Sequence, residues 1–501
     1  MVILIAMAVL ALGVLVGFAL LREAWMDELF TYVYTDPAKS AGEHFRTQWA
    51  NEPHPATYYF LVWAWRSLAA SQTGIFWLRL LSIGLSAGLF VGALGAYRAL
   101  IGGRVVVFAA FLLTSPVLLF YGQEARSYFF SFFGGVYLGI VFLSAVRPAP
   151  LQWRSLWITG LAGVILCTVH FISSFTAIFF ILCLGMIALY RRRWDIVIFA
   201  GVLVTLALVC VGSNILFSSG LRNATSSFWI GGSDVLQSIV WMPAFIGLPM
   251  IAIVAGVLAS PALRAHLKTE QALTPAFYAL GAVFLFVAFA YGVCVVKPFI
   301  VLRYLCTWVG FFLVPAVFVA TYALEALKLD GASALAMLIG TSFVGDTLLM
   351  SVTPHTTGPW REAGLFVQGI PACRDATIPF TVLSFVPKGN DLEAYSRMFA
   401  WHAGGDPHRF VGAEPASLDR AAAQSCPIRL WAANMRPQYL EPEVKDAFER
   451  TCAHEPISVL SYERGYLFVP SSDVQTIAEW KGAQSSCAEA LTPKGLLDVL
   501  R

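Results

Sequence analysis

The feature that most constrains this chain is a series of apolar segments, each long enough to cross a lipid bilayer. They fill about 350 residues and are separated only by short polar breaks. A spanning helix needs about 20 mostly apolar residues. Hydrophobic residues make up 58% of the 501 positions and charged residues 13%, against roughly 45–50% and about 25% in soluble proteins. The sequence therefore excludes a cytosolic enzyme, a disordered protein and a disulfide-rich secreted miniprotein, and predicts a polytopic membrane protein.

The predicted fold class is mainly α, a bundle of about eleven membrane spans followed by a small soluble α/β domain. The predicted spans are residues 2–21, 77–97, 105–122, 128–146, 156–171, 174–190, 196–216, 237–259, 276–296, 304–324 and 332–352. The net charge of +3 is too small to indicate a nucleic-acid partner. The expected partners include membrane lipids.

Basic residues in short loops predict the orientation, because such loops stay in the cytoplasm. The clearest is the run Arg191, Arg192, Arg193. The other basic pairs and single residues are Arg98 with Arg104, Arg147 with Arg154, Arg264 with Lys268, and Lys328. If all of them face the cytoplasm, the N-terminus lies inside and the soluble domain outside.

The apolar stretch from Tyr58 to Ala70 is left out of the span count. It has about thirteen strongly apolar or aromatic residues, which is short for a crossing. Counting it would put Arg98 and Arg104 on the outside, against the charge rule. We interpret it as a helix at the outer interface, where Tyr and Trp are frequent. A short true span remains the alternative.

The predicted domains are a transmembrane domain over residues 1–352, including an outer loop over 22–76, and a soluble domain over 353–501. In the soluble part, strands are predicted at 379–386, 428–433 and 457–469, and helices at 358–367, 391–403 and 443–452. Four of the nine cysteines lie there: Cys373, Cys426, Cys452 and Cys487. An even number predicts two disulfides in an oxidising compartment, with four free thiols as the alternative.

Under this topology, many polar side chains fall at the outer ends of spans: Asp27, Glu28, Glu52, His54, Gln123, Glu124, Arg126, His170, Arg222, Lys297 and Arg303. Ionisable groups at membrane depth are costly, and they usually line a cavity or pair with one another. In the adjacent pair Asp27 and Glu28, one carboxylate can accept a proton while the other orients it. The alternative is an ordinary acidic helix start.

The other polar groups suggest an anion site. Two prolines flank His54 and fix its backbone. Arg126, Lys297 and Arg303 are cations at a face where cations are otherwise scarce, and Arg suits bidentate contacts with phosphate. Snorkelling of these side chains to the interface is the alternative. A divalent metal is possible and no cofactor is certain. The candidate metal ligands are Glu52, His54, Glu124 and His170, and their spacing is not diagnostic.

Taken together, these motifs resemble a known family over roughly residues 20–310. The motifs are Asp27-Glu28, His54-Pro55 before Tyr58-Tyr59, Arg79-Leu80, Gln123-Glu124-Ala125-Arg126-Ser127-Tyr128, Thr168-Val169-His170 and Arg303-Tyr304. The chain resembles the GT-C superfamily of integral-membrane glycosyltransferases, in the branch of the protein O-mannosyltransferases and the aminoarabinose transferases. One departure is Ala56, where many relatives have a second proline.

The resemblance implies transfer of a sugar from a polyprenyl-phosphate donor to a hydroxyl of a glycan, lipid or protein acceptor. It implies an enzyme of the bacterial inner membrane, acting in the cell envelope, with a periplasmic C-terminal domain. Asp27 would be the general base of an inverting displacement, and Glu28 its neighbour. The expected substrate-binding residues are His54, Gln123, Glu124, Arg126, His170, Lys297, Arg303 and Tyr304. The alternatives are a transporter or flippase of lipid-linked glycans, and a non-catalytic scaffold.

Overall fold

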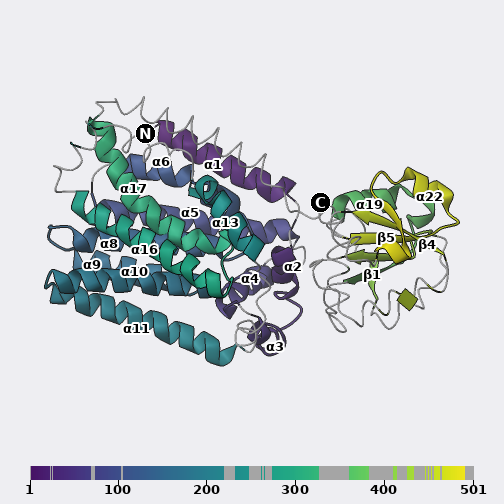
Figure 1. The fold of residues 1–501 in the computed structure, drawn as a ribbon, viewed down its shortest axis with the longest axis horizontal. Coiled ribbons are helices and arrows are strands. Elements are labelled where there is room, and N and C mark those ends of the chain that lie inside the picture. Colours follow the sequence, from purple (N-terminus) through teal and green to yellow (C-terminus); the bar gives the residue numbers. More distant parts are fainter. Residues whose placement is uncertain are drawn as a thin grey trace. The chain divides into compact units, whose positions relative to one another are not determined.

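The chain forms two compact units in its computed structural model. The helical unit comprises residues 1–21 and 34–354, and the sheet unit comprises residues 22–33 and 355–501 (Figure 1). The structure describes residues 2–22, 24, 26–52, 54–68, 74–102, 105–218, 232–246, 261, 265, 273–326, 360–382, 396, 410–413, 426–433, 446, 449–450, 453, 456–462 and 465–490.

The helical unit consists of apolar helices joined by short turns. Its helices are α1 (Val2–Leu21), α3 (Ala41–Thr47), η1 (Trp49–Asn51), α4 (Ala56–Leu68), α5 (Ile75–Leu100), α6 (Val105–Leu113), α7 (Pro116–Tyr121), α8 (Tyr128–Val146), α9 (Trp153–Cys167), α10 (Phe171–Tyr190), α11 (Trp194–Phe217), α13 (Gly232–Ile246), α16 (Thr274–Val296), η3 (Leu302–Leu305) and α17 (Cys306–Ala326). Among the described residues, six helical segments are long and apolar enough to cross a membrane. The membrane-bundle prediction is confirmed, whereas the count of about eleven is not. The span predicted at 332–352 lies outside the described residues.

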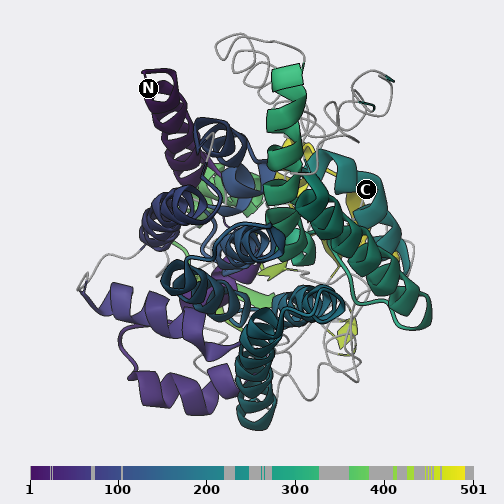
Figure 2. The ribbon, with the colours of Figure 1, turned by 90° about the vertical axis from the view of Figure 1, so that its left-hand side faces the viewer.

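Helix α8 forms the centre of the helical unit, and all of its residues are buried (Figure 2). It packs closely against α17, α9 and α5. Small residues allow this close approach, as is typical of helix pairs in membranes. At Gly310 of α17, an added Cβ would collide with the carbonyl oxygen of Phe132 on α8. The two backbones are therefore in direct contact at this point.

The span predicted over 105–122 is wrong as a single helix. Helix α6 ends at Leu113 and α7 begins at Pro116. Proline has no backbone N–H and disfavours helical geometry in the residue before it. Ser115 accordingly has an extended backbone, with φ at −69° and ψ at 122°. The break divides the apolar run into two helices, and the second one, α7, ends just before the polar segment 122–127.

The chain makes no net crossing between α1 and α5. Arg79, in the first turns of α5, donates a hydrogen bond of 3.1 Å from Nη1 to the carbonyl oxygen of Ala19, near the end of α1. The two helices therefore meet at one end of the unit. Helix α4 has 13 residues, or about 20 Å, which is less than the ~30 Å of a bilayer core. This length agrees with the interpretation that Tyr58–Ala70 does not cross, which stays a prediction together with its place at the outer interface.

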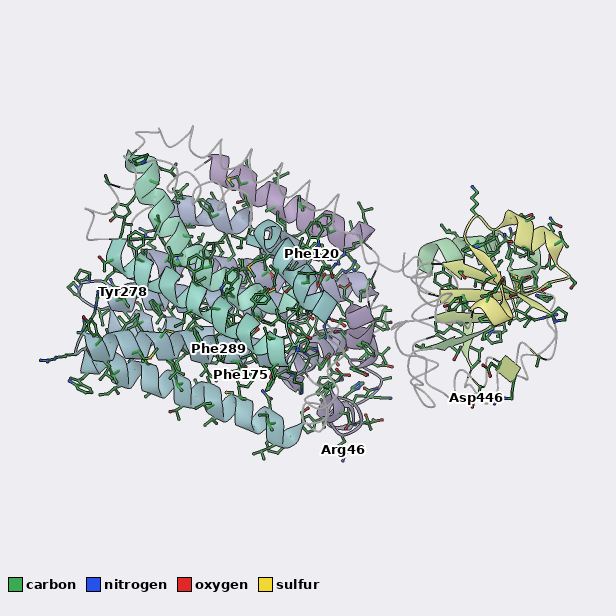
Figure 3. All side chains as sticks on the ribbon, viewed as in Figure 1. Arg46, Phe120, Phe175, Tyr278, Phe289 and Asp446 are labelled. Atoms are coloured by element: carbon green, nitrogen blue, oxygen red, sulfur yellow. A yellow bond between two sulfur atoms is a disulfide. The ribbon has the colours of Figure 1, made fainter. Side chains whose placement is uncertain are left out.

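The helical unit has two ends with different residues. The cluster end is where α1 ends and α5, α8 and α10 begin, and the arginine end is where α5, α8 and α10 end. At the arginine end, Arg147 Nη1 donates to the carbonyl oxygen of Ile101 and Arg191 Nη1 to that of Val146, each at 2.7 Å. Arg147 and Arg191, two of the predicted cytoplasmic basic residues, thus share one end. Arg104, Arg264, Lys268 and Lys328 lie outside the described residues. Figure 3 shows Tyr278 at this end and Phe120 and Arg46 toward the other.

The sheet unit contains a mixed six-stranded sheet in the order β2-β1-β3-β5-β4-β6. Its strands are β1 (Ile378–Val382), β2 (Phe410–Gly412), β3 (Leu430–Ala433), β4 (Ile457–Tyr462), β5 (Gly465–Pro470) and β6 (Gln484–Ser486), and its helices are α2 (Met26–Val33), α19 (Trp360–Gly369), η4 (Pro371–Cys373), α22 (Val474–Glu479) and α23 (Cys487–Ala490). Strand β1 pairs in parallel with β2 and β3, and the other pairs are antiparallel. The α/β prediction is confirmed.

The core of the sheet unit surrounds Trp431, which is fully buried. Its ring lies 5.0 Å from that of Phe410 and 5.9 Å from that of Phe380, and its Nε1 donates a hydrogen bond to the hydroxyl of Tyr462. A Trp can be buried because its single N–H finds a partner. Strands β2 and β6 were not predicted, and the helices predicted at 391–403 and 443–452 lie almost entirely outside the described residues.

The disulfide prediction is confirmed for three of the four cysteines. Cys373 bonds to Cys426, and Cys487 is also disulfide-bonded. Cys452 lies outside the described residues. The five cysteines of the helical unit are free thiols, as expected for small apolar side chains within helices.

Candidate active site

The cluster end contains a buried polar segment of irregular backbone, residues 122–127, between α7 and α8. Gln123 and Glu124 have no exposed surface, and Arg126 is 5% exposed. The backbone turns sharply, with Arg126 N donating to the carbonyl oxygen of Glu124 at 2.7 Å. In a membrane protein, non-helical backbone is tolerated only where protein surrounds it or it lines a cavity. The segment therefore has the character of a built polar site.

Helix α4 supplies the partner of Arg126. Arg126 Nη1 donates a hydrogen bond of 3.0 Å to the hydroxyl of Tyr59, and its guanidinium carbon lies 6.0 Å from the centre of that ring. Tyr58, the preceding residue, pairs with Ser82 of α5 at 3.2 Å between hydroxyl oxygens. Tyr59 also packs edge-on against Tyr34, at 5.9 Å between ring centres. The short helix is thus fixed between α5 and the start of α8, and it fixes Arg126 in turn.

A histidine cluster lies beside this pair and is formed by His54, Tyr128, His170 and Tyr304. The ring of His170 lies 5.3 Å from His54, 5.7 Å from Tyr128 and 5.0 Å from Tyr304. The four residues come from the loop before α4, the start of α8, the α9–α10 turn and η3. His170 is at the turn because α9 ends at Cys167 and α10 begins at Phe171. Four segments far apart in sequence therefore meet here.

Burial and nearby positive charges both disfavour protonation of His54. Burial lowers the pKa of His54 well below its ordinary value of 6.5, and the charges of Arg126, His170 and Arg303 lower it further. Desolvation and like charges both disfavour the protonated imidazole. His54 is therefore neutral at pH 7 and can accept a proton or a hydrogen bond. Arg303, half-buried in η3, has its guanidinium carbon 5.6 Å from the Tyr304 ring centre.

The structure brings together His54, Arg126, His170, Arg303 and Tyr304 from the predicted set. Gln123 and Glu124 share the buried segment, and Gln123 Nε2 donates a hydrogen bond of 3.0 Å to the carbonyl oxygen of Phe120. Lys297 is exposed at the end of α16. Arg222 lies outside the described residues.

The predicted catalytic carboxylates belong to the sheet unit. Asp27 and Glu28 occupy the first turn of α2, Glu28 being fully buried and Asp27 half-buried. Acidic residues are favourable at a helix start because they complement its dipole, as the alternative interpretation of this pair required. Their catalytic role stays a prediction.

The candidate metal ligands do not form a metal site. In the part of the chain that the structure describes, no group of three or more His, Cys, Asp or Glu side chains could hold a metal ion. Glu52, His54, Glu124 and His170 all lie in that part. The neighbours of His170 within the histidine cluster are aromatic rings rather than carboxylates.

Two site residues, Tyr59 and Tyr128, were missing from the predicted binding set. Tyr59 lies on the buried face of α4 with Tyr58, Val62 and Arg66, a helical spacing that the sequence displays. Tyr128 follows Arg126 by two positions and begins α8. The sequence indicates that both tyrosines face the protein interior. It does not indicate that Tyr59 contacts Arg126 or that Tyr128 contacts His170.

Comparison with known proteins supports the fold. No protein-family model matches the chain, and no curated protein matches it by sequence. Two solved structures are similar to it, both of ArnT from Cupriavidus metallidurans. The apo form has 14% identity and a TM-score of 0.57, and the form bound to undecaprenyl phosphate has 13% identity and a TM-score of 0.55. Each match covers 96% of this chain and 99% of the ArnT chain. The chain therefore has the same overall fold as these two ArnT structures.

Proposed function

We propose that this protein is a membrane glycosyltransferase that moves a sugar from a polyprenyl-phosphate donor to an acceptor hydroxyl. The observation that carries the proposal is the gathering of two arginines with a histidine cluster at one end of the helical unit. Arg126 is bonded to Tyr59, Arg303 lies against Tyr304, and His54 and His170 lie beside them. Cations at membrane depth are costly and usually mark a functional site, and arginine suits contacts with phosphate oxygens. The undecaprenyl phosphate bound to the similar ArnT structure supports a lipid-linked donor.

The reaction is a single displacement at the anomeric carbon. The acceptor oxygen forms a bond to this carbon while the bond from the carbon to the phosphate oxygen breaks, and the electron pair stays on the phosphate. The acceptor proton passes to a carboxylate, for which Asp27 is the proposed base. General-base assistance of this kind is typically worth 10²–10⁴-fold. One displacement inverts the configuration of the sugar.

The cluster residues would act on the leaving group. Arg126 and Arg303 would bind the phosphate oxygens, where fixed cations in a water-poor site stabilise developing charge. The donor phosphate is a diester with one negative charge, whereas the product is a monoester whose second pKa is about 6. A neutral His54 would donate its one N–H to a phosphate oxygen as this second charge appears. Tyr59 would hold Arg126 in position through its hydroxyl.

We further propose that the site faces the outer surface of a bacterial inner membrane and that the sheet unit is periplasmic. The basic residues at the arginine end support this orientation, because loops rich in Lys and Arg stay in the cytoplasm. The disulfides of the sheet unit agree with an oxidising compartment. A hexose or an aminopentose would fit the proposed class of donor, and a glycan, a lipid or a protein the class of acceptor.

The test uses the purified full-length protein in lipid nanodiscs. It would be incubated with a panel of polyprenyl-phosphate sugars, radiolabelled in the sugar, and with candidate acceptors. We expect acceptor-dependent release of polyprenyl phosphate, and its loss in the double variant Arg126→Ala/Arg303→Ala. A transporter would instead move the intact donor between the leaflets of a vesicle without breaking the sugar–phosphate bond. Translocation without release of polyprenyl phosphate would overturn the proposal.

A further inference from the structure

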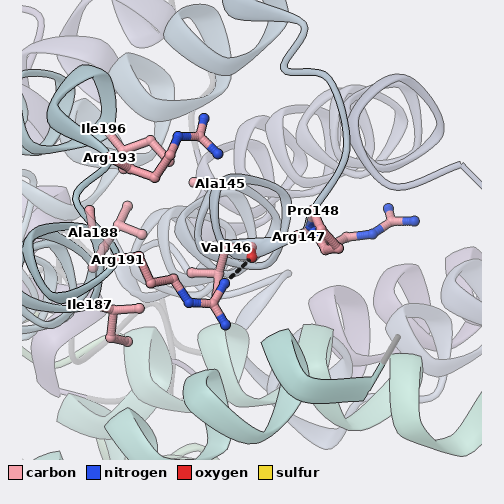
Figure 4. A pocket seen from close by; sticks show the side chains of 10 residues that line it. Ala145, Val146, Arg147, Pro148, Ile187, Ala188, Arg191, Arg193 and Ile196 are labelled. Carbon is pink, nitrogen blue, oxygen red and sulfur yellow. Dashed lines mark hydrogen bonds between the residues drawn. The ribbon is translucent and has the colours of Figure 1, made fainter. Parts of the chain in front are cut away.

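The arginine end of the helical unit has a pocket that the proposed reaction does not use. It has a volume of about 220 Å³ and lies where α8 and α10 end and α11 begins. Its apolar wall includes Leu184, Ile187 and Ile196, and its polar wall includes Arg147, Arg191 and Arg193. Figure 4 shows the guanidinium groups of Arg191 and Arg193 on two sides of this pocket, whereas that of Arg147 extends away from both.

Arg191 is only partly engaged by the protein. Its Nη1 donates to the carbonyl oxygen of Val146 at 2.7 Å, and its guanidinium carbon lies 4.9 Å from the ring centre of Tyr278. In the described part of the chain no carboxylate pairs with it. A guanidinium has five N–H donors in a fork that matches phosphate oxygens. Capping the end of α8 thus occupies one donor nitrogen and leaves the rest of the fork free to bind an anion.

Arg193 is the second cation of the pocket. It forms hydrogen bonds of 3.1 and 2.9 Å to the two carboxylate oxygens of Asp195, two positions along the chain. This pair is half-exposed, with 39% and 41% of the two side chains accessible. Exposed pairs of this kind are weak. An incoming anion can therefore compete with Asp195 for Arg193.

The turn between α10 and α11 holds these two arginines in place. Its central residue, Arg192, has a φ of 56°, the left-handed conformation that usually selects glycine at a helix end. The backbone N–H of Arg193 donates a hydrogen bond of 2.8 Å to the carbonyl oxygen of Ala188. This geometry places Arg191 and Arg193 at the pocket and leaves Arg192 exposed and outside its lining. Arg192 is therefore a matched control for its neighbours.

We infer that this pocket binds the phosphate head group of an anionic phospholipid in the leaflet at the arginine end. Helix α8 has 19 residues, or about 28 Å, so the pocket lies one bilayer thickness from the histidine cluster. An apolar wall beside guanidinium groups suits a ligand with acyl chains and a phosphate, and basic pockets between spanning helices bind such head groups. The volume is below the roughly 300–1,000 Å³ of pockets for drug-sized ligands, which favours a head group over a whole lipid.

The experiment measures lipid binding to the full-length protein in detergent by native mass spectrometry. The probes are phosphatidylglycerol, phosphatidylcholine with the same acyl chains, and inorganic phosphate. We expect phosphatidylglycerol to bind at least tenfold more tightly than phosphatidylcholine. Arg191→Gln and Arg193→Gln should each lower its affinity about tenfold or more, as expected for loss of a charged hydrogen bond. Arg192→Gln, the same change in the same turn, should alter it by less than about twofold.

A gain of affinity separates the proposal from a simple folding defect. Asp195→Asn removes the carboxylate that competes for Arg193 and should tighten phosphatidylglycerol binding. Equal losses in the Arg191, Arg192 and Arg193 variants would overturn the proposal, because they would indicate diffuse attraction to a basic surface. Displacement of the lipid by inorganic phosphate at matching concentration would also overturn it, in favour of a site for a soluble anion.

Discussion

The two ends of the helical unit both contain arginines, but in different surroundings. At the cluster end, Arg126 is 5% exposed and donates to the hydroxyl of a buried tyrosine. At the arginine end, Arg191 is exposed and donates to the last carbonyl of a helix. Desolvating a cation is costly, whereas capping a helix end with one is favourable. The same residue type is thus buried against a tyrosine hydroxyl at one end and caps a helix at the other, and we propose a reaction at the first and lipid contact at the second.

The largest expected effect comes from removing the proposed base. Asp27→Asn keeps the shape and hydrogen bonding of the side chain but removes its basicity. We expect turnover to fall at least about a hundredfold while donor binding is retained, as measured with radiolabelled donor in nanodiscs.

Glu28→Gln is the matched control for Asp27, and it should cost less because Glu28 is expected to orient rather than to accept the proton. Near-normal turnover in Asp27→Asn together with an inactive Glu28→Gln would reverse the two roles. Full activity in both variants would place the base elsewhere.

The next effect concerns donor binding at the cluster end. Arg126→Ala and Arg303→Ala should each lose a charged hydrogen bond to phosphate, worth roughly 1.5–3 kcal/mol, and weaken the donor about ten- to a hundredfold. Titration of the protein with polyprenyl phosphate would measure this. Lys297→Ala, at an exposed position, should cost less.

Arg192→Gln at the other end is the control for donor binding and should leave donor affinity unchanged. If Arg126→Ala and Arg303→Ala both bind the donor with the affinity of the unmodified protein, these arginines do not bind the donor phosphate, and the two ends do not differ in phosphate recognition.

A third prediction concerns the middle of the unit, which joins both ends. Gly310→Ala places a methyl group against the carbonyl oxygen of Phe132, and overpacking of this kind costs about 1–3 kcal/mol. We expect a lower midpoint of thermal unfolding in detergent, with the cluster end and the arginine end losing their structure together. Gly281→Ala, where an added Cβ meets nothing within 4 Å, should leave the midpoint nearly unchanged. Equal midpoints for the two variants would show that α8 and α17 separate readily.

The smallest effect is a pH dependence from His54. Because its pKa is lowered in the folded protein, the unfolded chain takes up a proton first as the pH falls below about 6.5. The folded state therefore loses stability on acidification from there, by at most about 1.4 kcal/mol per pH unit. His54→Asn should make the free energy of unfolding less dependent on pH between pH 7 and pH 5. An unchanged slope in this variant would mean that His54 is not held neutral.

Much of the fold follows from residue patterns. Apolar runs predicted the helical unit. The basic loops predicted that the segment around α4 makes no crossing, and the bond from Arg79 to Ala19 agrees with that prediction. Hydropathy could not predict the break at Ser115, because the residues on both sides are equally apolar and only Pro116 interrupts the helix. The number of spans was not confirmed for a related reason: the mean hydropathy of a segment does not determine where its helix begins and ends.

The site was predictable in its members more than in its contacts. His54, His170 and Tyr304 were expected at one face, but ring-to-ring contact among them depends on how the loop before α4, the α9–α10 turn and η3 come together. The partner of Arg126 was not predicted, because Tyr59 lies 67 positions away. The arginines at 191 and 193 were interpreted only as topology signals, since a pocket needs three helix ends brought together.

The complete burial of α8 has a consequence for chemical labelling from the lipid phase. An apolar photoreactive probe dissolved in the acyl chains inserts into the side chains it meets. In α11 only 33% of the spanning window is buried, whereas in α8 all of it is. The probe should mark α11 heavily and leave α8 unmodified, although hydropathy alone assigns both helices to the membrane. Helix α8 is surrounded by protein rather than by lipid. The substitutions that it tolerates are therefore limited by the shape of the neighbouring helices and not by the hydrophobicity of the bilayer.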